Sequence, residues 1–445
     1  MKYRSHLWLA ALLLTGSVTL AEDVAKPQPL TVKQAIAIAL RSNPAVREAG
    51  ARVEIANATT DRVRAEERLQ MNLDSRYVYL SEVPTVAAAV PGFPPVVLGS
   101  NATWIGALAA QQLLYSGGRV PALVQQASDS ARAAAALGER TRQQVAYGAE
   151  RACYLVLAAE RERQVAQDSL TAAEEHYRVA QARYEERAAA QYDVLRAQVQ
   201  VEESRQELIV SESDIAVAQA ALAQALGAQE GTYAVADGEM ISAASPPALE
   251  PALAQAKIQR PELTAANLQI AAAGEGEAAA RAERRPALSL LADYQVASPE
   301  SPFQFTRWSA AAAIHLPILD GGRIGARIRE AIGTCHQATA ARDELCDTVT
   351  QEVRTAHARL VSAITQVEVV RKRVELAEQA LQISNVRYAA GVATTTEVMD
   401  SEAALTRARQ ELTRALTGQA IADAGLRLAM GAIVTTPEAY EEVAR

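Results

Sequence analysis

The chain has 445 residues and a net charge of −8, and aromatic residues make up only 4% of it. This charge argues against nucleic-acid binding, which usually shows a basic patch. Ala, Gln, Glu and Arg fill much of the sequence, a composition typical of long helices and coiled coils.

The first 21 residues have the parts of a secretory signal peptide. Lys2 and Arg4 provide the positive start, residues 7–14 the apolar stretch, and Ala21 ends a small-residue cleavage site. The apolar stretch is shorter than the ~20 residues that a spanning helix needs, which argues against a membrane anchor. We therefore predict an exported protein. No Cys follows the apolar stretch to support a lipid anchor.

The rest of the chain contains an internal duplication. Residues 115–119 (YSGGR) recur 204 residues later as residues 319–323 (LDGGR). The same shift relates Trp104 to Trp308, Tyr184 to Tyr388, Asp193-Val194 to Glu397-Val398, and Leu226-Gly227 to Met430-Gly431. Upstream, Asn43-Pro44 matches Arg260-Pro261 at a shift of 217. The first copy therefore carries 13 extra residues, which we place in the Pro- and Gly-rich loop at 84–99.

The duplication sets the expected domain organisation. Residues 1–21 form the signal peptide, 22–227 a first repeat, 228–248 a linker or equatorial segment, 249–431 a second repeat, and 432–445 a C-terminal tail. Each repeat is expected to contain a helix, two strands and a long helical hairpin.

Two of the predicted helices are much longer than a globular domain. No Pro occurs between Pro121 and Pro246 or between Pro317 and Pro437, and a Pro inside a helix costs about 3 kcal/mol. The expected long helices are 118–187 and 322–390, with return helices at 190–227 and 394–430. Apolar residues recur every seven positions, as in Val353, Leu360, Val367, Val374 and Leu381, a spacing that predicts coiled-coil packing.

Each repeat also has a shorter helix before its strands. These helices are expected at 31–70 and 250–285, and each runs in the same direction as its return helix. Stacked end to end, 31–70 and 190–227 would about match the length of 118–187.

Four strands are predicted between the helices, at 73–81, 103–115, 287–298 and 307–319. The last alternates one apolar face with one small or polar face, a pattern typical of strands in membrane β-barrels. Trp104 and Trp308 begin equivalent strands and could anchor them at a membrane interface. The alternative is an ordinary half-buried sheet with both Trp side chains in its core. Four strands are fewer than the ~8 of the smallest membrane barrels, so strands that span a membrane require an oligomer.

The duplication, the Gly-Gly-Arg turn after the second and fourth strands, and the motifs Arg183-Tyr184 and Arg387-Tyr388 resemble the TolC-like outer-membrane factor family. The resemblance covers essentially the whole chain after the signal peptide. It implies a mainly helical fold with membrane β-strands. Three copies would share one 12-stranded β-barrel, continued by a periplasmic α-helical coiled-coil tunnel with a small mixed domain around it.

The resemblance also implies a location and a function. The chain would be a homotrimer in the outer membrane of a Gram-negative bacterium, the exit duct of a tripartite efflux pump or type I secretion system. A periplasmic adaptor protein and an inner-membrane pump of the RND or ABC type would open it. Drugs, metal ions and secreted proteins all remain open as substrates, and no cofactor is implied.

The resemblance assigns roles to the hairpin ends. The periplasmic gate would comprise Tyr184, Tyr388, Asp193, Glu397 and Asp400, and the adaptor would contact Glu186, Arg187, Ala188, Gly391 and Val392. The first turn lacks a Gly, and Ala393 lacks the basic side chain that some members use as a latch, so the gate would be restrained differently here.

Acidic residues at a constriction have a clear physical effect. Symmetry-related carboxylates concentrate negative potential there and favour cations. The alternative is that Asp193, Glu397 and Asp400 are solvated coiled-coil surface.

No motif of an enzyme, metal site or nucleotide site emerges. His176, His315, His336 and His357 stand singly, without the spacing of a known catalytic or zinc motif. Cys335 and Cys346 would lie roughly 16 Å apart along a helix, too far for a disulfide. The main competing function is a periplasmic coiled-coil adaptor or scaffold. An adaptor would normally carry one hairpin, so two equal hairpins, each with its own strands, favour the duct.

Overall fold

The computed structural model describes residues 30–83, 85–86, 96–97, 100–228, 233–235, 245–299 and 305–441. The predicted signal peptide and most of the predicted loop at 84–99 lie outside the described residues, as do parts of the predicted linker and tail.

The two repeats have the same order of elements. Repeat one contains helices α1 (Val32–Ser42) and α2 (Pro44–Arg64), a 3₁₀ turn (Ala65–Glu67), strands β1 (Gln70–Tyr79) and β4 (Ala102–Tyr115), and the hairpin α3 (Arg119–Glu185) and α4 (Gln191–Leu226). Between β1 and β4 lie the short strands β2 (Thr85–Val86) and β3 (Val96–Val97). Repeat two contains α5 (Leu249–Gln259), α6 (Pro261–Ala282), β5 (Ala287–Pro299), β6 (Phe305–His315), α7 (Arg323–Ala389) and α8 (Thr395–Ala429), followed by α9 (Glu438–Glu441).

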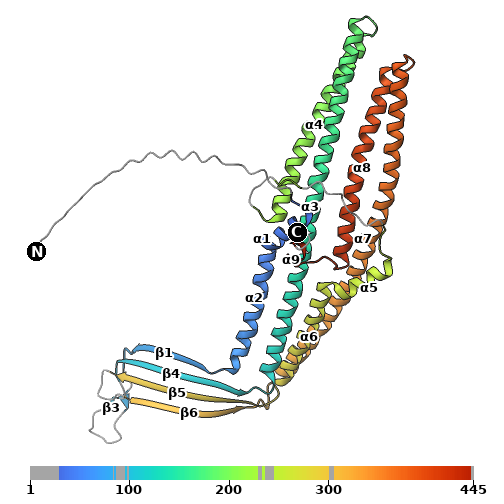
Figure 1. Cartoon of the computed structure of the whole chain (residues 1–445). Coiled ribbons are helices and arrows are strands. Elements are labelled where there is room, and N and C mark those ends of the chain that lie inside the picture. Colours follow the sequence, from blue (N-terminus) through green and yellow to red (C-terminus); the bar gives the residue numbers. More distant parts are fainter. Residues whose placement is uncertain are drawn as a thin grey trace, which may run out of the picture.

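The molecule is elongated, with the sheet at one end and the two hairpin turns at the other (Figure 1). The long helices α3 and α7 have 67 residues each, as the unbroken shift of 204 residues predicts. The predicted limits of both hairpins are thus confirmed to within two residues.

The predicted single helices at 31–70 and 250–285 are wrong. Each is divided in two at the residue before a Pro, where Asn43 and Arg260 adopt extended ψ angles of 129° and 117°. A residue that precedes Pro is sterically excluded from the helical region, so the chain bends there. Asn43 then caps the second helix, because its side-chain oxygen accepts a hydrogen bond from the Ala45 N–H at 2.9 Å.

These bends are the points where helices stack end to end. The Ser42 hydroxyl donates to the Leu226 carbonyl at 2.7 Å, and the Asn43 amide donates to the Ala225 carbonyl at 2.8 Å. Gly227 ends α4 with a φ of +73°, and a Cβ there would lie 2.8 Å from the Asn43 Cα. The end of α4 therefore abuts the junction of α1 and α2, which confirms the expected stacking along α3.

The four long strands form one antiparallel sheet in the order β1-β4-β5-β6. Its two hairpins have the same register, because Tyr77 lies opposite Trp104 as Tyr294 lies opposite Trp308. Both Trp side chains are exposed on the sheet, so the alternative that they form its core is wrong. Strand β6 ends at His315, four residues before its predicted end.

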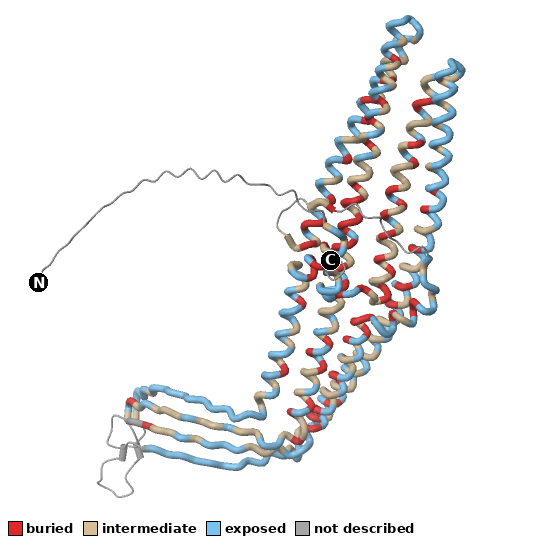
Figure 2. The backbone as a smooth tube through the Cα atoms, in the orientation of Figure 1, coloured by how far each residue is buried: buried red, intermediate tan, exposed pale blue. Residues whose placement is uncertain are grey.

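The core runs along the helices, while the sheet has few buried side chains (Figure 2). Val353, Leu360 and Val367, at successive heptad positions, are fully or almost fully buried. Among all the buried apolar residues that the structure describes, Ala is the most frequent, which lets helix backbones approach closely. Two clusters surround the stacked junctions, one formed with α1, α3 and α4 and the other with α5, α7 and α8.

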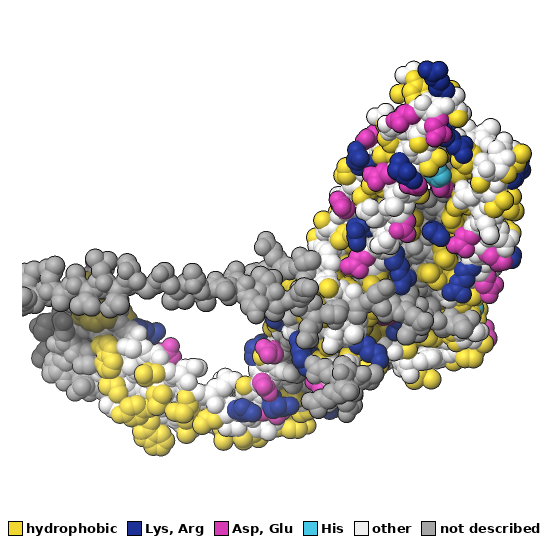
Figure 3. Space-filling view, turned by 45° about the horizontal axis from the view of Figure 1, so that its top comes forward, with side chains coloured by type: hydrophobic (Ala, Val, Ile, Leu, Met, Phe, Trp, Pro, Cys, Tyr) yellow, Lys and Arg dark blue, Asp and Glu magenta, His cyan; other side chains and the backbone are white. Residues whose placement is uncertain are grey.

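Side-chain types divide along the same axis. Hydrophobic side chains gather over the sheet, whereas acidic and basic ones are spread over the helical hairpins (Figure 3). Within the described part of the chain, no helix is both long enough and apolar enough to cross a bilayer.

Candidate functional site

The hairpin turns close with the same backbone pattern in both repeats. At the end of α3 the Ala188 N–H donates to the Arg183 carbonyl at 2.8 Å, and at the end of α7 the Val392 N–H donates to the Arg387 carbonyl at 3.0 Å. This arrangement needs a left-handed residue just before the donor. Gly391 takes that position with a φ of +76°, but in repeat one it is Arg187, with a φ of +61°. A residue with a Cβ is strained there by roughly 1 kcal/mol or more.

The three predicted gate carboxylates each lie in a different local setting. Asp193 accepts a hydrogen bond from the Ala190 N–H at 3.3 Å and thereby caps α4. Glu397 lies 3.8 Å from the Arg387 guanidinium in its own hairpin. Asp400 is exposed and lines a groove between the hairpins. The contacts within this single chain therefore do not bring the three together.

The two predicted gate tyrosines also differ. The Arg183 guanidinium from α3 lies over the Tyr388 ring at 4.3 Å from its centroid, a cation–π contact that joins the two hairpins. Tyr184, its counterpart in repeat one, is exposed. A second contact joins the hairpins nearby, since Arg196 donates to the Thr396 hydroxyl at 2.6 Å.

Farther along the two hairpins, α3 and α8 are joined by ion pairs. We call this contact between α3 and α8 the internal seam. Glu150 pairs with Arg427 at 2.6 Å, Glu162 with Arg414 at 2.8 Å, and His176 with Glu402 at 2.5 Å. The hydrogen bond to Glu402 raises the pKa of His176 above its usual value, and burial opposes it only in part. A protonated His176 therefore favours a closed seam.

The seam is not tightly packed near the tips. Two hollows of about 560 and 430 Å³ lie along it, and they share Glu203, Glu207 and Gln410 as lining residues. Acidic side chains outnumber basic ones in both linings. A polar contact of this kind resists separation less than an apolar core does.

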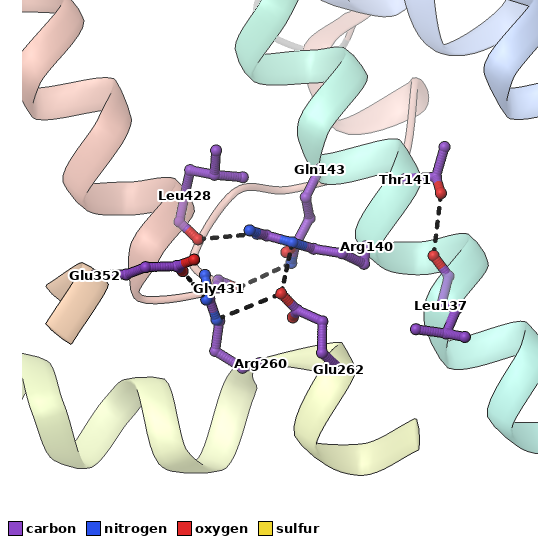
Figure 4. Close-up of polar contacts among 9 residues, drawn as sticks. All are labelled: Leu137, Arg140, Thr141, Gln143, Arg260, Glu262, Glu352, Leu428 and Gly431. Atoms are coloured by element: carbon purple, nitrogen blue, oxygen red, sulfur yellow. Dashed lines mark hydrogen bonds and ion pairs between the residues drawn. The ribbon is translucent and has the colours of Figure 1, made fainter. Parts of the chain in front are cut away.

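A buried charge cluster fastens the seam at its other end, near the stacked junction of repeat two (Figure 4). Arg260 is only 1% exposed, and it contacts Glu352 of α7 and lies 3.6 Å from Glu262. Arg140 of α3 pairs with Glu262 at 2.7 Å and donates to the Leu428 carbonyl at 3.3 Å. Burial lowers the pKa of Arg140, and the Glu262 carboxylate opposes this shift. The cluster thus links repeat one to three helices of repeat two.

The sequence pattern did not predict these inter-hairpin partners. His176 was noted only as an isolated His, and Arg260 only as a landmark of the duplication. The 204-residue shift offered one usable signal, because it pairs Arg183-Tyr184 with Arg387-Tyr388. The three Cys residues are free, in agreement with the prediction that Cys335 and Cys346 lie too far apart for a disulfide; Cys153 is buried and the other two are half-buried. No group of three or more metal-binding side chains occurs among the described residues.

Comparison with known proteins gives these features a context. A family model described as "Outer membrane efflux protein" matches residues 35–228 and 252–432. SilC of Salmonella typhimurium, a probable outer membrane lipoprotein, is 26% identical over 224 residues, 47% of this chain and 48% of SilC. Outer membrane protein OprJ of Pseudomonas aeruginosa is 28% identical over 148 residues, 32% of this chain and 31% of OprJ. These matches span about half of SilC and a third of OprJ.

The fold is similar to the crystal structure of CusC, described in connection with transmembrane channel formation. The TM-score is 0.76 at 20% sequence identity, and the match covers 90% of this chain and 92% of CusC. The family model matches most of the chain, in both repeats. The protein is therefore a member of the outer membrane efflux protein family.

Proposed function

We propose that the protein is an outer-membrane exit duct, a passive conduit for a tripartite efflux pump or a type I secretion system. One observation carries this proposal: the molecule has an exposed four-stranded sheet at one end and the turns of two helical hairpins at the other. Family membership supports it, as does the similarity to OprJ, an outer membrane protein, and to CusC, whose structures are described in connection with transmembrane channel formation.

The assembly that completes the duct is a homotrimer. Strands β1 and β6 are the two edges of the sheet, and three such sheets would join edge to edge into one 12-stranded barrel. Exposed apolar side chains on one face of the strands, including Leu73, Tyr77, Trp308 and Ile314, would then face lipid. Six hairpins would continue the barrel as a periplasmic tunnel.

The hairpin tips are the proposed gate and docking surface. A periplasmic adaptor would contact the turns at Arg187 and Gly391, and the inner-membrane pump would act through it. Asp400, which is exposed and lines the groove between the hairpins, would contribute to an acidic constriction with Glu397 and Asp193. Bulky substitutions at Arg187 or Gly391 are expected to block adaptor binding in a pull-down while leaving the oligomer intact.

The proposal excludes a soluble adaptor or scaffold, the main competing function. Cell fractionation followed by detergent extraction separates the two. A duct is expected in the outer-membrane fraction as a detergent-dependent trimer by native mass spectrometry. Recovery as a soluble periplasmic monomer would overturn the duct and leave the scaffold as the better reading.

The acidic constriction has its own test. Asp400→Ala, alone or with Glu397→Ala, is expected to weaken the cation preference of the channel in planar-bilayer recordings. Unchanged ion selectivity in the double variant would show that these carboxylates do not line the narrowest point.

A further inference from the structure

A cavity lies beside the buried charge cluster of Figure 4, between α3 of repeat one and the hairpin of α7 and α8 in repeat two. Its volume is about 720 Å³, within the usual range for small-molecule sites. Arg140 and Tyr147 line it from α3, and Arg260 lines it from the junction of α5 and α6. The cavity belongs to a single chain, so its chemistry does not depend on the proposed trimer.

Two glycines of α8 leave the cavity open. Gly418 and Gly425 both line it, and because they are seven residues apart they lie on one face of the helix. A Cβ at Gly418 would meet nothing within 4 Å, and one at Gly425 would meet only the Tyr147 hydroxyl, at 4.0 Å. Glycine inside a helix is destabilising relative to Ala. Packing does not require either glycine, whereas a larger side chain would take up part of the cavity.

Three arginines and two carboxylates meet at this cavity. Arg140, Arg260 and Arg359 line it together with Glu352, and Glu262 pairs with Arg140 at 2.7 Å. Both carboxylates are thus already in ion pairs, since Glu352 contacts Arg260. Arg359 is exposed and forms no ion pair with any residue that the structure describes. One positive charge is therefore left without a partner.

The Arg260 side chain is buried but its hydrogen bonding is incomplete. It is only 1% exposed, and its Nη2 donates to Glu352. Its Nε lies 3.6 Å from Glu262 Oε1, too far for a hydrogen bond, and its Nη1 has no hydrogen-bond partner in the described part of the chain. A buried donor that lacks an acceptor is costly. An acceptor with negative charge would satisfy both the donor and the charge.

Much of the remaining lining is apolar. Ala356 and Ala363 of α7 and Ile421, Ala422 and Leu428 of α8 lie in the same wall as the arginines. An inorganic anion would meet the charge but leave these side chains uncovered. A ligand that suits the whole cavity therefore combines one negative charge with an apolar body.

The equivalent place in repeat one lacks this chemistry. A smaller hollow of about 330 Å³ lies there, and of the described residues that line it only Arg151 is charged. Its lining has Asn43, Gly148 and Leu155 in place of Arg260, Glu352 and Arg359. The counterparts of Gly418 and Gly425 on α4 are Asp214 and Ala221. The open, charged cavity is thus particular to repeat two and does not simply follow from the duplicated packing.

We propose that this cavity binds a small organic monoanion, a carboxylate on a compact apolar body. Arg260 donates to the carboxylate through Nη1, and Arg359 supplies the balancing positive charge. Ile421 and Leu428 contact the apolar body. The bound molecule touches α3, α7 and α8 together, so it strengthens the junction between the two repeats.

Isothermal titration calorimetry of the full-length protein in an uncharged detergent tests this site. The probe is cyclohexanecarboxylate, and its neutral match is cyclohexanecarboxamide. Saturable binding of the carboxylate is expected, with binding of the amide weaker by at least about tenfold, because the amide lacks the charge that the arginines meet. Inorganic phosphate is also expected to bind more weakly than the carboxylate, since it leaves the apolar wall uncovered.

Two variants locate the binding. Gly425→Leu fills the cavity and Arg359→Gln removes the unpaired charge, so each is expected to weaken carboxylate binding by at least about tenfold. Leu is a better helix former than Gly, so lost binding in Gly425→Leu does not reflect a weaker helix. The matched control is Gly148→Leu, in the hollow of repeat one, which is expected to bind as the wild type does.

Four results would each overturn the proposal. They are the absence of saturable binding, equal binding of carboxylate and amide, phosphate binding as tight as that of the carboxylate, and carboxylate binding that survives both Gly425→Leu and Arg359→Gln. None of these measurements depends on the oligomer or on conductance. A failure here therefore leaves the proposed duct untouched, and a failure of the duct in cell fractionation leaves this site untouched.

Discussion

The two repeats share one backbone plan but differ in chemistry at matching places. At the stacked junction, repeat one has the neutral Asn43, whereas repeat two has the buried Arg260. On the return helices, repeat one has the exposed and uncharged Val210, whereas repeat two has Arg414 at the matching place and uses it in an ion pair with repeat one. Duplication supplied two similar units, and these substitutions give matching places in the two units different contacts.

The largest expected effect concerns the outward face of α7. Leu376 is exposed on α7. Leu376→Glu would place a charge on a face that the proposed trimer would bury between copies, at a cost of several kcal/mol. The trimer is expected to dissociate in native mass spectrometry. The matched control is Ala172→Glu on α3, which lines a polar groove of the internal seam and is expected to leave the trimer intact. Equal loss of trimer in both variants would show that a charge on the outward face of α7 disrupts the trimer no more than a charge at the internal seam does.

The second largest effect is a loss of stability at the two stacked junctions, which differ in their polar contacts. Arg260→Met removes a buried cation and leaves Glu262 and Glu352 without it, for an expected loss of about 3 kcal/mol. Asn43→Ala removes a helix cap and is expected to cost about 1 kcal/mol. Thermal unfolding followed by circular dichroism should show a clearly larger drop in midpoint for Arg260→Met. A similar drop for both would mean that the charge cluster adds nothing to the junction.

Substitutions in the two hairpin turns are expected to change stability by less. Gly391→Ala is expected to destabilise its turn by about 1 kcal/mol, because Ala does not favour a φ of +76°. Arg187→Gly relieves the same strain in repeat one, although part of the gain is lost to the flexibility of Gly in the unfolded chain. Hydrogen exchange of the turn amides is expected to rise in the first variant and to stay level or fall in the second. Faster exchange in Arg187→Gly would contradict the strain at this position.

The smallest effect is a pH dependence of the internal seam. The pKa of His176 is raised by its hydrogen bond to Glu402, and Glu175 acts in the same direction. A raised pKa means that the contact is fully present below about pH 6.5 and is lost as the pH rises through the higher value. Its contribution is expected to be below about 1 kcal/mol. The midpoint difference between pH 6 and pH 8.5 should shrink in His176→Gln, and an unchanged difference would assign the pH effect to other groups.

Much of the fold follows from local sequence signals. The long helices are bounded by Gly-Gly-Arg turns and Pro-free runs, so their limits could be predicted to within two residues. The bends at Asn43 and Arg260 were missed because the helical pattern was given more weight than the following Pro. The end of β6 at His315 could not be predicted from alternation, since pairing with another strand decides where a strand stops.

The residues that pair across the internal seam could not be predicted from local sequence patterns. His176 and Glu402 lie 226 residues apart in sequence, and only the rotation of two long helices brings their side chains within 2.5 Å. That rotation depends on how small residues such as Ala173 and Ala408 pack, which no heptad count fixes. The gate carboxylates were identified by resemblance, and their roles remain proposals that depend on the assembled trimer.

Single-channel recording in planar bilayers tests most directly whether this protein is a duct that opens at its internal seam. Arg414→Glu replaces the ion pair with Glu162 by two carboxylates that repel each other, so we expect a stable trimer with a higher conductance than the wild type. Glu162→Arg in the same chain restores the charge pair and should return the conductance to the wild-type level. If the Arg414→Glu trimer inserts but conducts no better than the wild type, the duct does not open at the internal seam.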